Sequence, residues 1–181
     1  MDDVALRPLT EQDADRLRAF FTRVPPGDRT FFREDVLQPV VVERWLADPA
    51  QRRFVAIDGD DVVGHLALVR GVGWTAHVVE IRLVVDPARR RHGLGRQLAR
   101  RAVVEAVELG ATKLVVEVVA NQEATVAMFT TLGFEAEGLL RDHVRSQDGE
   151  MHDLLVLAHL VEPLWDAMRT TGVEDLVLRD G

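Results

Sequence analysis

The alternation of hydrophobic and polar positions predicts a chain of mixed strands and helices. Runs rich in β-branched residues predict strands, and hydrophobic residues three or four positions apart predict helices. The expected strands cover residues 4–9, 54–57, 62–69, 77–85, 114–119, 139–144 and 151–157. The expected helices cover residues 13–23, capped by Thr10 and Asp13, and residues 40–48, 96–109 and 125–132, with a terminal helix around Trp165 and Met168. The predicted order is therefore β-α-α-β-β-β-α-β-α-β-β.

Turn-forming residues separate these elements. The sequence Asp-Gly-Asp-Asp at 58–61 predicts a hairpin, because its glycine adopts positive φ without strain. The Pro-Pro-Gly at 25–27 is expected to end the first helix, and Gly110 to end the helix over 96–109. No repeat, low-complexity tract or linker interrupts the chain. We therefore expect a single domain over residues 1–181.

Composition narrows the chemistry. The 181 residues are 47% hydrophobic, enough for one ordinary core. They include no Cys and no Tyr, which excludes disulfides, a thiolate nucleophile, a cysteine zinc site and a tyrosine acid. The net charge of -8 argues against nucleic-acid binding and suits a cationic or amine substrate. The chain begins without a signal-like pattern and its apolar stretches are short, so we expect a cytoplasmic protein with no membrane partner.

A glycine turn stands out at Arg90-Arg91-His92-Gly93-Leu94-Gly95, after a strand pattern and at the start of an amphipathic helix. Successive backbone N–H groups in such a turn point at an anion, and the helix dipole adds positive potential. Two other phosphate-loop motifs fail. The Walker motif fails because Lys113 follows Thr112, and the dinucleotide form at Gly71, Gly73 and Ala76 precedes a strand where a helix is required.

The turn and its surroundings resemble the acetyl-CoA-binding motif of the GNAT superfamily of N-acyltransferases. The likeness extends to Val84-Val85-Asp86-Pro87 before the turn, and to Asn121, Ala124, Phe129 and Leu132-Gly133-Phe134 after it. The resemblance implies an α+β fold with a mostly antiparallel sheet and flanking helices, splayed between the fourth and fifth strands at the acyl-CoA site. It also implies acetyl-CoA as co-substrate and no metal.

Carried onto this chain, the resemblance assigns the cofactor contacts. The main chain of Leu83, Val84 and Val85 would hold the pantetheine arm, with the Val85 N–H directed at the thioester carbonyl. The pyrophosphate would be held by Arg90, Arg91, His92, Gly93, Leu94, Gly95 and Arg96. Asn121 would contact the cofactor, although counting back from Phe134 reaches Gln122; either amide could bind, and Asn121 could instead be an ordinary helix cap. Phe129 occupies the position of a family tyrosine and cannot donate a proton.

Acyl transfer requires a neutral amine, so a base or proton wire is needed. Glu80 and Glu117 interrupt apolar strands and resemble places where GNAT enzymes carry a general-base glutamate, with Glu80 the first choice. Glu80 could equally form a cross-strand ion pair or lie at an exposed edge, and Glu117 could pair with an arginine. His143, His152 and Asp153 are further candidates, and their spacing suggests no metal site.

The resemblance therefore implies an N-acetyltransferase that transfers an acetyl group from acetyl-CoA to a primary amine by direct attack in a ternary complex. The acceptor would be a small amine, an amino acid or a protein lysine. The sequence is compatible with a homodimer. The alternative is a non-catalytic acyl-CoA-binding sensor or interaction module.

Overall fold

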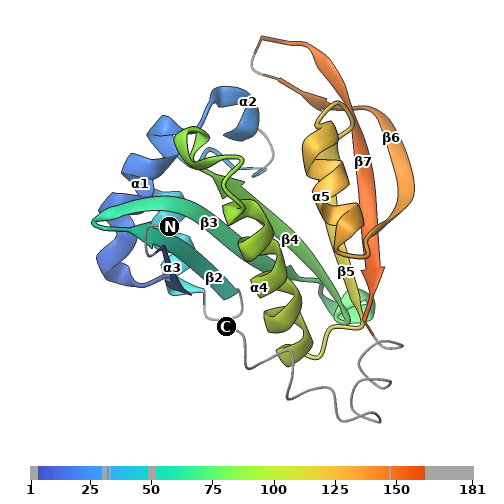
Figure 1. The fold of residues 1–181 in the computed structure, drawn as a ribbon, viewed down its shortest axis with the longest axis horizontal. Coiled ribbons are helices and arrows are strands. Elements are labelled where there is room, and N and C mark those ends of the chain that lie inside the picture. The colour runs from blue at the N-terminus through green and yellow to red at the C-terminus, as the bar shows by residue number, and fades with distance from the viewer. Residues whose placement is uncertain (1–3, 30–31, 33, 49–51, 147, 162–181) are drawn as a thin grey trace.

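A mixed sheet flanked by helices forms the framework of the structure, a computed structural model that describes residues 4–29, 32, 34–48, 52–146 and 148–161 (Figure 1). Its strands are β1 (Ala5–Pro8), β2 (Arg52–Asp58), β3 (Asp61–Arg70), β4 (Val78–Val85), β5 (Lys113–Val119), β6 (Glu135–Arg145) and β7 (Met151–Leu160). The predicted strands are all present. The terminal helix expected around Trp165 and Met168 lies outside the described residues.

The helices follow the predicted order, with one addition. They are α1 (Ala14–Arg23), α2 (Pro26–Arg29), α3 (Pro39–Ala47), α4 (Leu94–Glu108) and α5 (Glu123–Thr131), with single 3₁₀ turns at Glu11–Asp13, Gly73–Thr75 and Pro87–Arg89. The Pro-Pro-Gly sequence was expected only to end α1. It also starts α2, because proline is well suited to the first turn of a helix. Among the described residues, no helix is long and apolar enough to cross a membrane.

The strand order across the sheet is β1-β2-β3-β4-β5-β7-β6. Every neighbouring pair is antiparallel except β4 and β5, which run parallel. These two strands pair only at Val78–Lys113, Val79–Leu114 and Glu80–Val115, and then separate (Figure 1). The predicted splay between the fourth and fifth strands is therefore confirmed.

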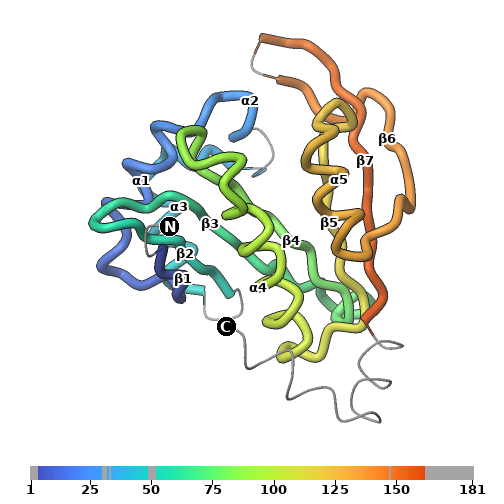
Figure 2. The backbone as a smooth tube through the Cα atoms, viewed as in Figure 1, coloured from blue at the N-terminus to red at the C-terminus, as the bar shows by residue number. Residues whose placement is uncertain are grey.

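Two hydrophobic layers cover the two faces of the sheet. One layer includes Ile81 and Val85 of β4 and packs against Leu98 of α4. The other includes Val84 and packs against Phe21 of α1 and the α3 side chains. Figure 2 shows α4 on one side of β3 and β4, with α1 and α3 on the other. Successive β4 side chains thus point to opposite layers, as strand geometry requires.

Hydrogen bonds to the Asp13 carboxylate fix the N-terminal segment just before α1. Arg7 donates two hydrogen bonds of 2.7 Å to the carboxylate of Asp13, and the Thr10 hydroxyl and main-chain N–H donate to it at 2.8 and 2.9 Å. The Arg7 bonds, with those from Thr10, hold the pKa of Asp13 well below its usual range. The predicted cap at Thr10 and Asp13 is confirmed.

A fully buried histidine lies in the second layer. His65 of β3 stacks on Trp45 at a centroid distance of 5.3 Å and lies against Phe21 and Phe32. Neither of its ring nitrogens has a hydrogen-bond partner in the described part of the chain. Burial, and then the positive charge of Arg53, lower the pKa of His65 well below its ordinary value of 6.5. The folded protein therefore holds this imidazole neutral.

We expect this histidine to make the fold sensitive to mild acid. In the unfolded chain His65 takes up a proton near pH 6.5, whereas the buried ring does not, so the unfolded state binds more protons below that pH. The free energy of unfolding should fall by at most about 1.4 kcal/mol per pH unit as the pH drops below about 6.5. Urea unfolding of the wild-type and His65→Phe proteins between pH 5 and 7.5 measures this, with the exposed His77→Gln as control. Equal slopes in wild type and His65→Phe would contradict the assignment.

Candidate functional site

The separation of β4 from β5 leaves one edge of β4 facing an opening. The main-chain N–H of Asp86 donates to Val63 of β3, and the carbonyl of Val78 accepts from Gly71, so the even-numbered residues of this strand direct their polar main-chain groups toward β3. By alternation, the odd-numbered residues direct theirs the other way; the His77 carbonyl, which accepts from Thr112 and Lys113, agrees.

Two of the three predicted main-chain contacts therefore face the opening. The N–H and C=O groups of Leu83 and Val85 point into it, beyond the last β4–β5 pair at Glu80 and Val115. The main chain of Val84 instead faces His65 of β3, so the structure does not place it where a pantetheine contact was expected. Val84 nevertheless lines the opening.

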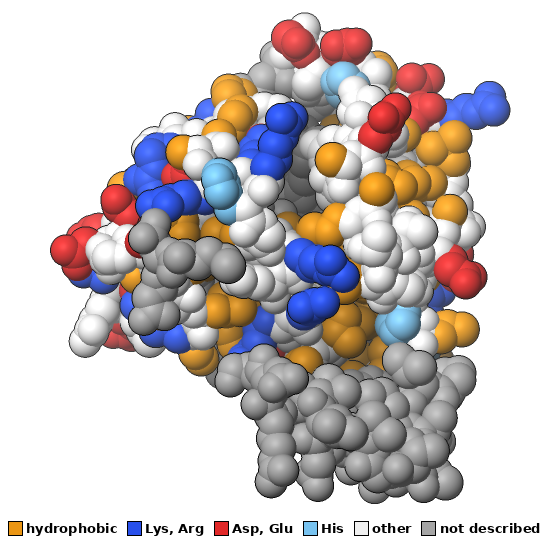
Figure 3. Space-filling model, in the orientation of Figure 1, with side chains coloured by type: hydrophobic (Ala, Val, Ile, Leu, Met, Phe, Trp, Pro, Cys, Tyr) orange, Lys and Arg blue, Asp and Glu red, His pale blue; other side chains and the backbone are white. Residues whose placement is uncertain are grey.

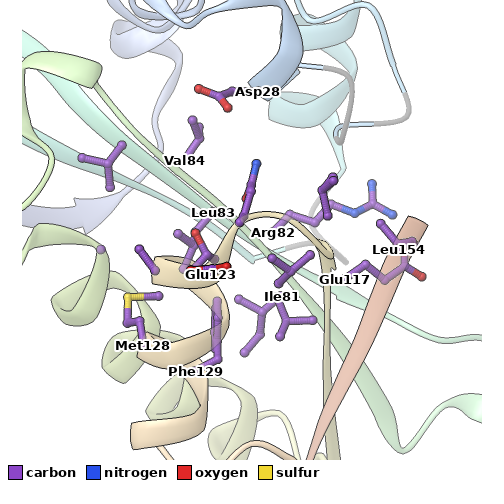
Figure 4. Close-up of a pocket in the computed structure, with 18 of the residues that line it drawn as sticks. Asp28, Ile81, Arg82, Leu83, Val84, Glu117, Glu123, Met128, Phe129 and Leu154 are labelled. Atoms are coloured by element: carbon purple, nitrogen blue, oxygen red, sulfur yellow. The ribbon is translucent and has the colours of Figure 1, made fainter. Parts of the chain in front are cut away.

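A cavity of about 1220 Å³ fills the opening and extends to β6 (Figure 4). Most of the predicted site residues line it together: Glu80, Leu83, Val84, Val85, Arg90, Arg91, Gly93, Gly95, Arg96, Glu117, Asn121 and Phe129. Two predicted contacts do not line it. The side chain of Leu94 is buried in the core against the sheet, and His92 is exposed on the surface of the turn.

The glycine turn contains two residues with left-handed backbone conformation. Arg91 and Gly93 both have positive φ, at 64° and 85°. This alternation of left-handed residues turns successive N–H groups to one side. The turn leads directly into α4, which begins at Leu94, two residues earlier than predicted. The N–H groups of the first turn of a helix have no partner within the helix, so they add donors and positive potential at this end of the cavity.

Two ion pairs fix the segment of chain just before the glycine turn. Asp86 is buried, and its carboxylate accepts hydrogen bonds from the Ala88 N–H at 3.0 Å and from Arg23 of α1 at 2.9 Å. Arg89 pairs with Asp58 at the β2–β3 hairpin. These two contacts fix the chain on both sides of Pro87, so that the next two arginines extend toward the cavity.

Arg90 links the turn to the N-terminal part of the chain. Its guanidinium lies 2.5 Å from the carboxylate of Asp28 in α2 and donates to the Val85 carbonyl at 3.2 Å. Figure 3 shows Lys and Arg side chains gathered along the hollow between the two halves of this face. An anion in the cavity would meet Arg90, Arg91 and Arg96 on this side.

Glu80, the first choice for a general base, forms an ion pair with an arginine on its own strand. Arg82 donates to both carboxylate oxygens of Glu80, at 2.7 and 2.9 Å. Both side chains are partly buried and line the cavity (Figure 4 labels Arg82). From the sequence, Glu80 could also have formed a cross-strand ion pair or lain at an exposed edge. The structure shows an ion pair between residues two apart on one strand, which share a face of the sheet.

The second glutamate lies on the same face. Val115 of β5 is opposite Glu80, so Glu117, two residues further, points to the same side of the sheet. It is partly buried near Leu154 of β7 (Figure 4). One wall of the cavity therefore carries the carboxylates of Glu80 and Glu117 with the Arg82 guanidinium, and the glycine turn on the other side carries arginines.

Helix α5 closes the cavity from the other face. Phe129 is buried against Phe134, with ring centroids 5.1 Å apart, and lines the cavity with its apolar surface. The residue that caps α5 is Gln122, and not Asn121, which removes the interpretation of Asn121 as the helix cap. The side chain of Gln122 makes no capping hydrogen bond, and both amides line the cavity. Either amide is therefore available to a ligand.

Several lining residues were not predicted from the sequence as site residues, among them Asp28, Arg82 and Met128. Asp28 carries no motif, and its partner Arg90 is far away in the sequence. Arg82 could have been recognised, since residues two apart on a strand share a face. Met128 packs close to Gly95, where an added Cβ would lie 3.4 Å from the methionine sulfur.

Of the histidine candidates near the last hairpin, His143 lines the cavity, whereas His152 hydrogen-bonds with Ser146 outside it. No cluster of three potential metal ligands occurs among the described residues.

Comparisons with known proteins agree with this geometry. The N-alpha-acetyltransferase RimI of Mycobacterium tuberculosis is 27% identical over 84% of this chain and 92% of its own length. The structure of a ribosomal-protein-alanine N-acetyltransferase from Brucella melitensis superimposes with a TM-score of 0.75 at 24% identity, over 87% of this chain and 99% of its own. That of a spermidine N-acetyltransferase from Vibrio cholerae, in complex with CoA and spermine, gives 0.73 at 20% identity, over 87% and 95%.

The sequence model of the acetyltransferase (GNAT) family matches residues 14–134, from the start of α1 to the end of the α5 region. This range contains the splayed strands, the glycine turn and α5. The family match and the named N-acetyltransferases also argue against a non-catalytic binding module. The chain therefore belongs to the acetyltransferase (GNAT) family and is an acyltransferase enzyme.

Proposed function

We propose that this enzyme transfers an acetyl group from acetyl-CoA to the α-amino group at the N-terminus of a peptide or protein. The observation that carries the proposal is the ion pair between Glu80 and Arg82 on the cavity wall opposite the glycine turn. The names of two similar proteins, an N-alpha-acetyltransferase and a ribosomal-protein-alanine N-acetyltransferase, support it.

The cofactor half of the proposal rests on main-chain groups of β4 that lie beyond its pairing with β5. The main-chain groups of Leu83 and Val85 face the opening, where β5 no longer pairs with β4. The pantetheine arm carries amides that can pair with them as an added strand would. The pyrophosphate of CoA suits the turn over residues 90–96, with Arg91 and Arg96 beside it and Asn121 or Gln122 at the pantetheine.

The choice of an α-amine as the acceptor follows from the ordinary pKa values of the two kinds of amine. A neutral amine must attack the thioester carbon, and an α-amino group has an ordinary pKa near ~8, against about 10.4 for a lysine side chain. At pH 8 about half of α-amines are neutral, but only about one lysine in 250. Both carboxylate oxygens of Glu80 already accept hydrogen bonds from Arg82, so this carboxylate is a poor choice as the sole proton acceptor for a strongly basic amine. Such a site suits an amine that needs little help to lose its proton.

Glu80 and Glu117 are proposed to act on this amine. As carboxylates on one face of the sheet they draw the acceptor ammonium into the cavity and receive its proton. As the nitrogen–carbon bond forms and the carbon–sulfur bond breaks, the Val85 N–H donates to the carbonyl oxygen, which gains negative charge. Phe129 packs against the sulfur end and cannot protonate it, so the thiolate, with an ordinary pKa near ~8.5, takes its proton from the nitrogen or from water.

The acceptor class can be tested with a matched set of amines. We expect the wild-type enzyme to acetylate a short peptide with a free N-terminal alanine at least about tenfold faster, as kcat/KM, than the same peptide with a blocked N-terminus and an internal lysine. Free alanine and spermidine complete the set. Release of the CoA thiol measures turnover, and the chain contributes no thiol of its own because it has no Cys. Faster turnover of the lysine peptide, free alanine or spermidine would overturn the α-amine assignment.

The phosphate assignment predicts the effect of one charge in the turn. Arg91→Gln should weaken CoA binding by roughly 10- to 100-fold, because a charge-assisted hydrogen bond is worth about 1.5–3 kcal/mol. Binding of pantetheine, which lacks the pyrophosphate, should not change. Calorimetric titration of both ligands checks this. The exposed Arg100→Gln on α4 removes the same charge further along the helix and should leave CoA affinity unchanged; equal losses in the two variants would reject a specific phosphate contact.

The carboxylate assignment predicts a separate defect. Glu80→Gln and Glu117→Gln should each lower kcat/KM for the amine by at least about tenfold near neutral pH, since the ammonium loses an attracting charge and a proton acceptor. CoA affinity should stay within twofold. Glu108→Gln removes a carboxylate on α4, outside the cavity, and is the control. Unchanged turnover in Glu80→Gln would remove that residue from the reaction.

A further inference from the structure

The β6–β7 hairpin contains an irregularity where it borders the cavity. Leu140 lies opposite Leu154 and Val144 lies opposite His152, so three residues of β6 face the single residue Asp153 of β7. Such bulges often redirect a side chain next to an active site. Here the residue at the end of the bulge is His143, which lines the cavity.

The bulge is held in place by Asp153. Its carboxylate accepts a hydrogen bond of 2.9 Å from the main-chain N–H of Asp142. Asp142 has φ of 48°, a left-handed conformation that is unfavourable for most residues other than glycine and that aspartate tolerates better than most. The main-chain carbonyl of Asp153 also accepts from Ala120, directly after β5. One residue therefore fixes the bulge to the end of the strand that carries Glu117.

The position of the bulge relates it to the acceptor amine. His143 lines the cavity from β6, together with Glu117 of β5 and Leu154 of β7. These residues come from the side of the sheet opening away from the glycine turn, and the β6–β7 hairpin flanks the opening there (Figure 1). His143 is also exposed, so its ring reaches both the cavity and solvent.

The chemistry at this wall calls for such a group. Two carboxylates stabilise the ammonium form of a bound amine, and they are poor final holders of its proton, because the ordinary pKa of a glutamate is about 3.5 units below that of an α-amine. Imidazole is the side chain that both takes up and releases protons near neutrality. With no tyrosine in the chain and a buried Phe129 on α5, the cavity has few other groups of this kind.

We infer that His143 takes the proton of the acceptor ammonium out of the cavity and releases it to solvent, and that Asp153 positions it by holding the bulge. This inference rests on the proposed function. One proton of the ammonium, received first by the carboxylates, passes to the His143 imidazole, and the resulting amine attacks the thioester carbon. The second proton leaves the nitrogen as the carbon–sulfur bond breaks and ends on the thiolate. The products are the amide, the CoA thiol and one proton in solution.

The inference predicts a loss of turnover without a loss of cofactor binding. His143→Ala and His143→Gln should each lower kcat for the acceptor amine by about 100-fold. CoA affinity should stay within twofold and the melting temperature should not change. Imidazole added to the buffer should restore part of the rate of His143→Ala. His152→Gln removes a neighbouring imidazole that does not line the cavity and should retain the wild-type rate. A wild-type kcat in both His143 variants, or no rescue by imidazole, would overturn the proton role.

The role of Asp153 is separated by combining variants. Asp153→Ala should lower kcat as His143→Ala does, Asp153→Asn should keep the rate because it retains an acceptor oxygen, and the double variant His143→Ala/Asp153→Ala should be no slower than His143→Ala alone. Additive losses would show that Asp153 does not act through His143. If the wild type prefers another amine, the α-amine assignment fails, while the ratio of variant to wild type on that preferred amine still decides the role of His143.

Discussion

The separation of β4 from β5 is the constraint on which the rest of the structure depends. Buried main-chain polar groups need partners, and two strands that pair at three residues and then diverge leave theirs to something else. The divergence is not fraying of the sheet, because β4 remains paired with β3 and β5 with β7 over seven residue pairs each. Each wall of the opening is therefore a strand paired along its other edge.

The same constraint brings the turn to the opening. Two parallel neighbours need a crossover connection, and here the crossover is α4, which follows β4 after the 3₁₀ turn at Pro87–Arg89 and the glycine turn. Its N-terminus must lie at the end where the strands are apart. Buried Asp86 and its partner Arg23 then set the direction in which the chain leaves the strand. One wall of the cavity thus carries helix N–H groups and arginines, and the other carries Glu80, Arg82 and Glu117.

Much of this could be predicted from the sequence, and the limits have physical reasons. The strand and helix order follows from alternation and helical spacing, and the glycine turn from the residues at its left-handed positions. The first half of β6 was missed because this edge strand is largely exposed, so its side chains do not alternate between buried and polar. The contact between Asp28 and Arg90 joins distant segments, and a bulge such as the one before His143 depends on pairing with another strand. Neither leaves a local signal.

The alternation along β4 has a consequence for how this site would respond to random substitution. The groups of Leu83 and Val85 that face the opening belong to the main chain, so every amino acid except one supplies the same N–H and carbonyl at these positions. Only proline removes the N–H. A scan of side-chain replacements would register these residues as tolerant wherever packing survives, and the part of the cavity that is least replaceable would look like the part that matters least.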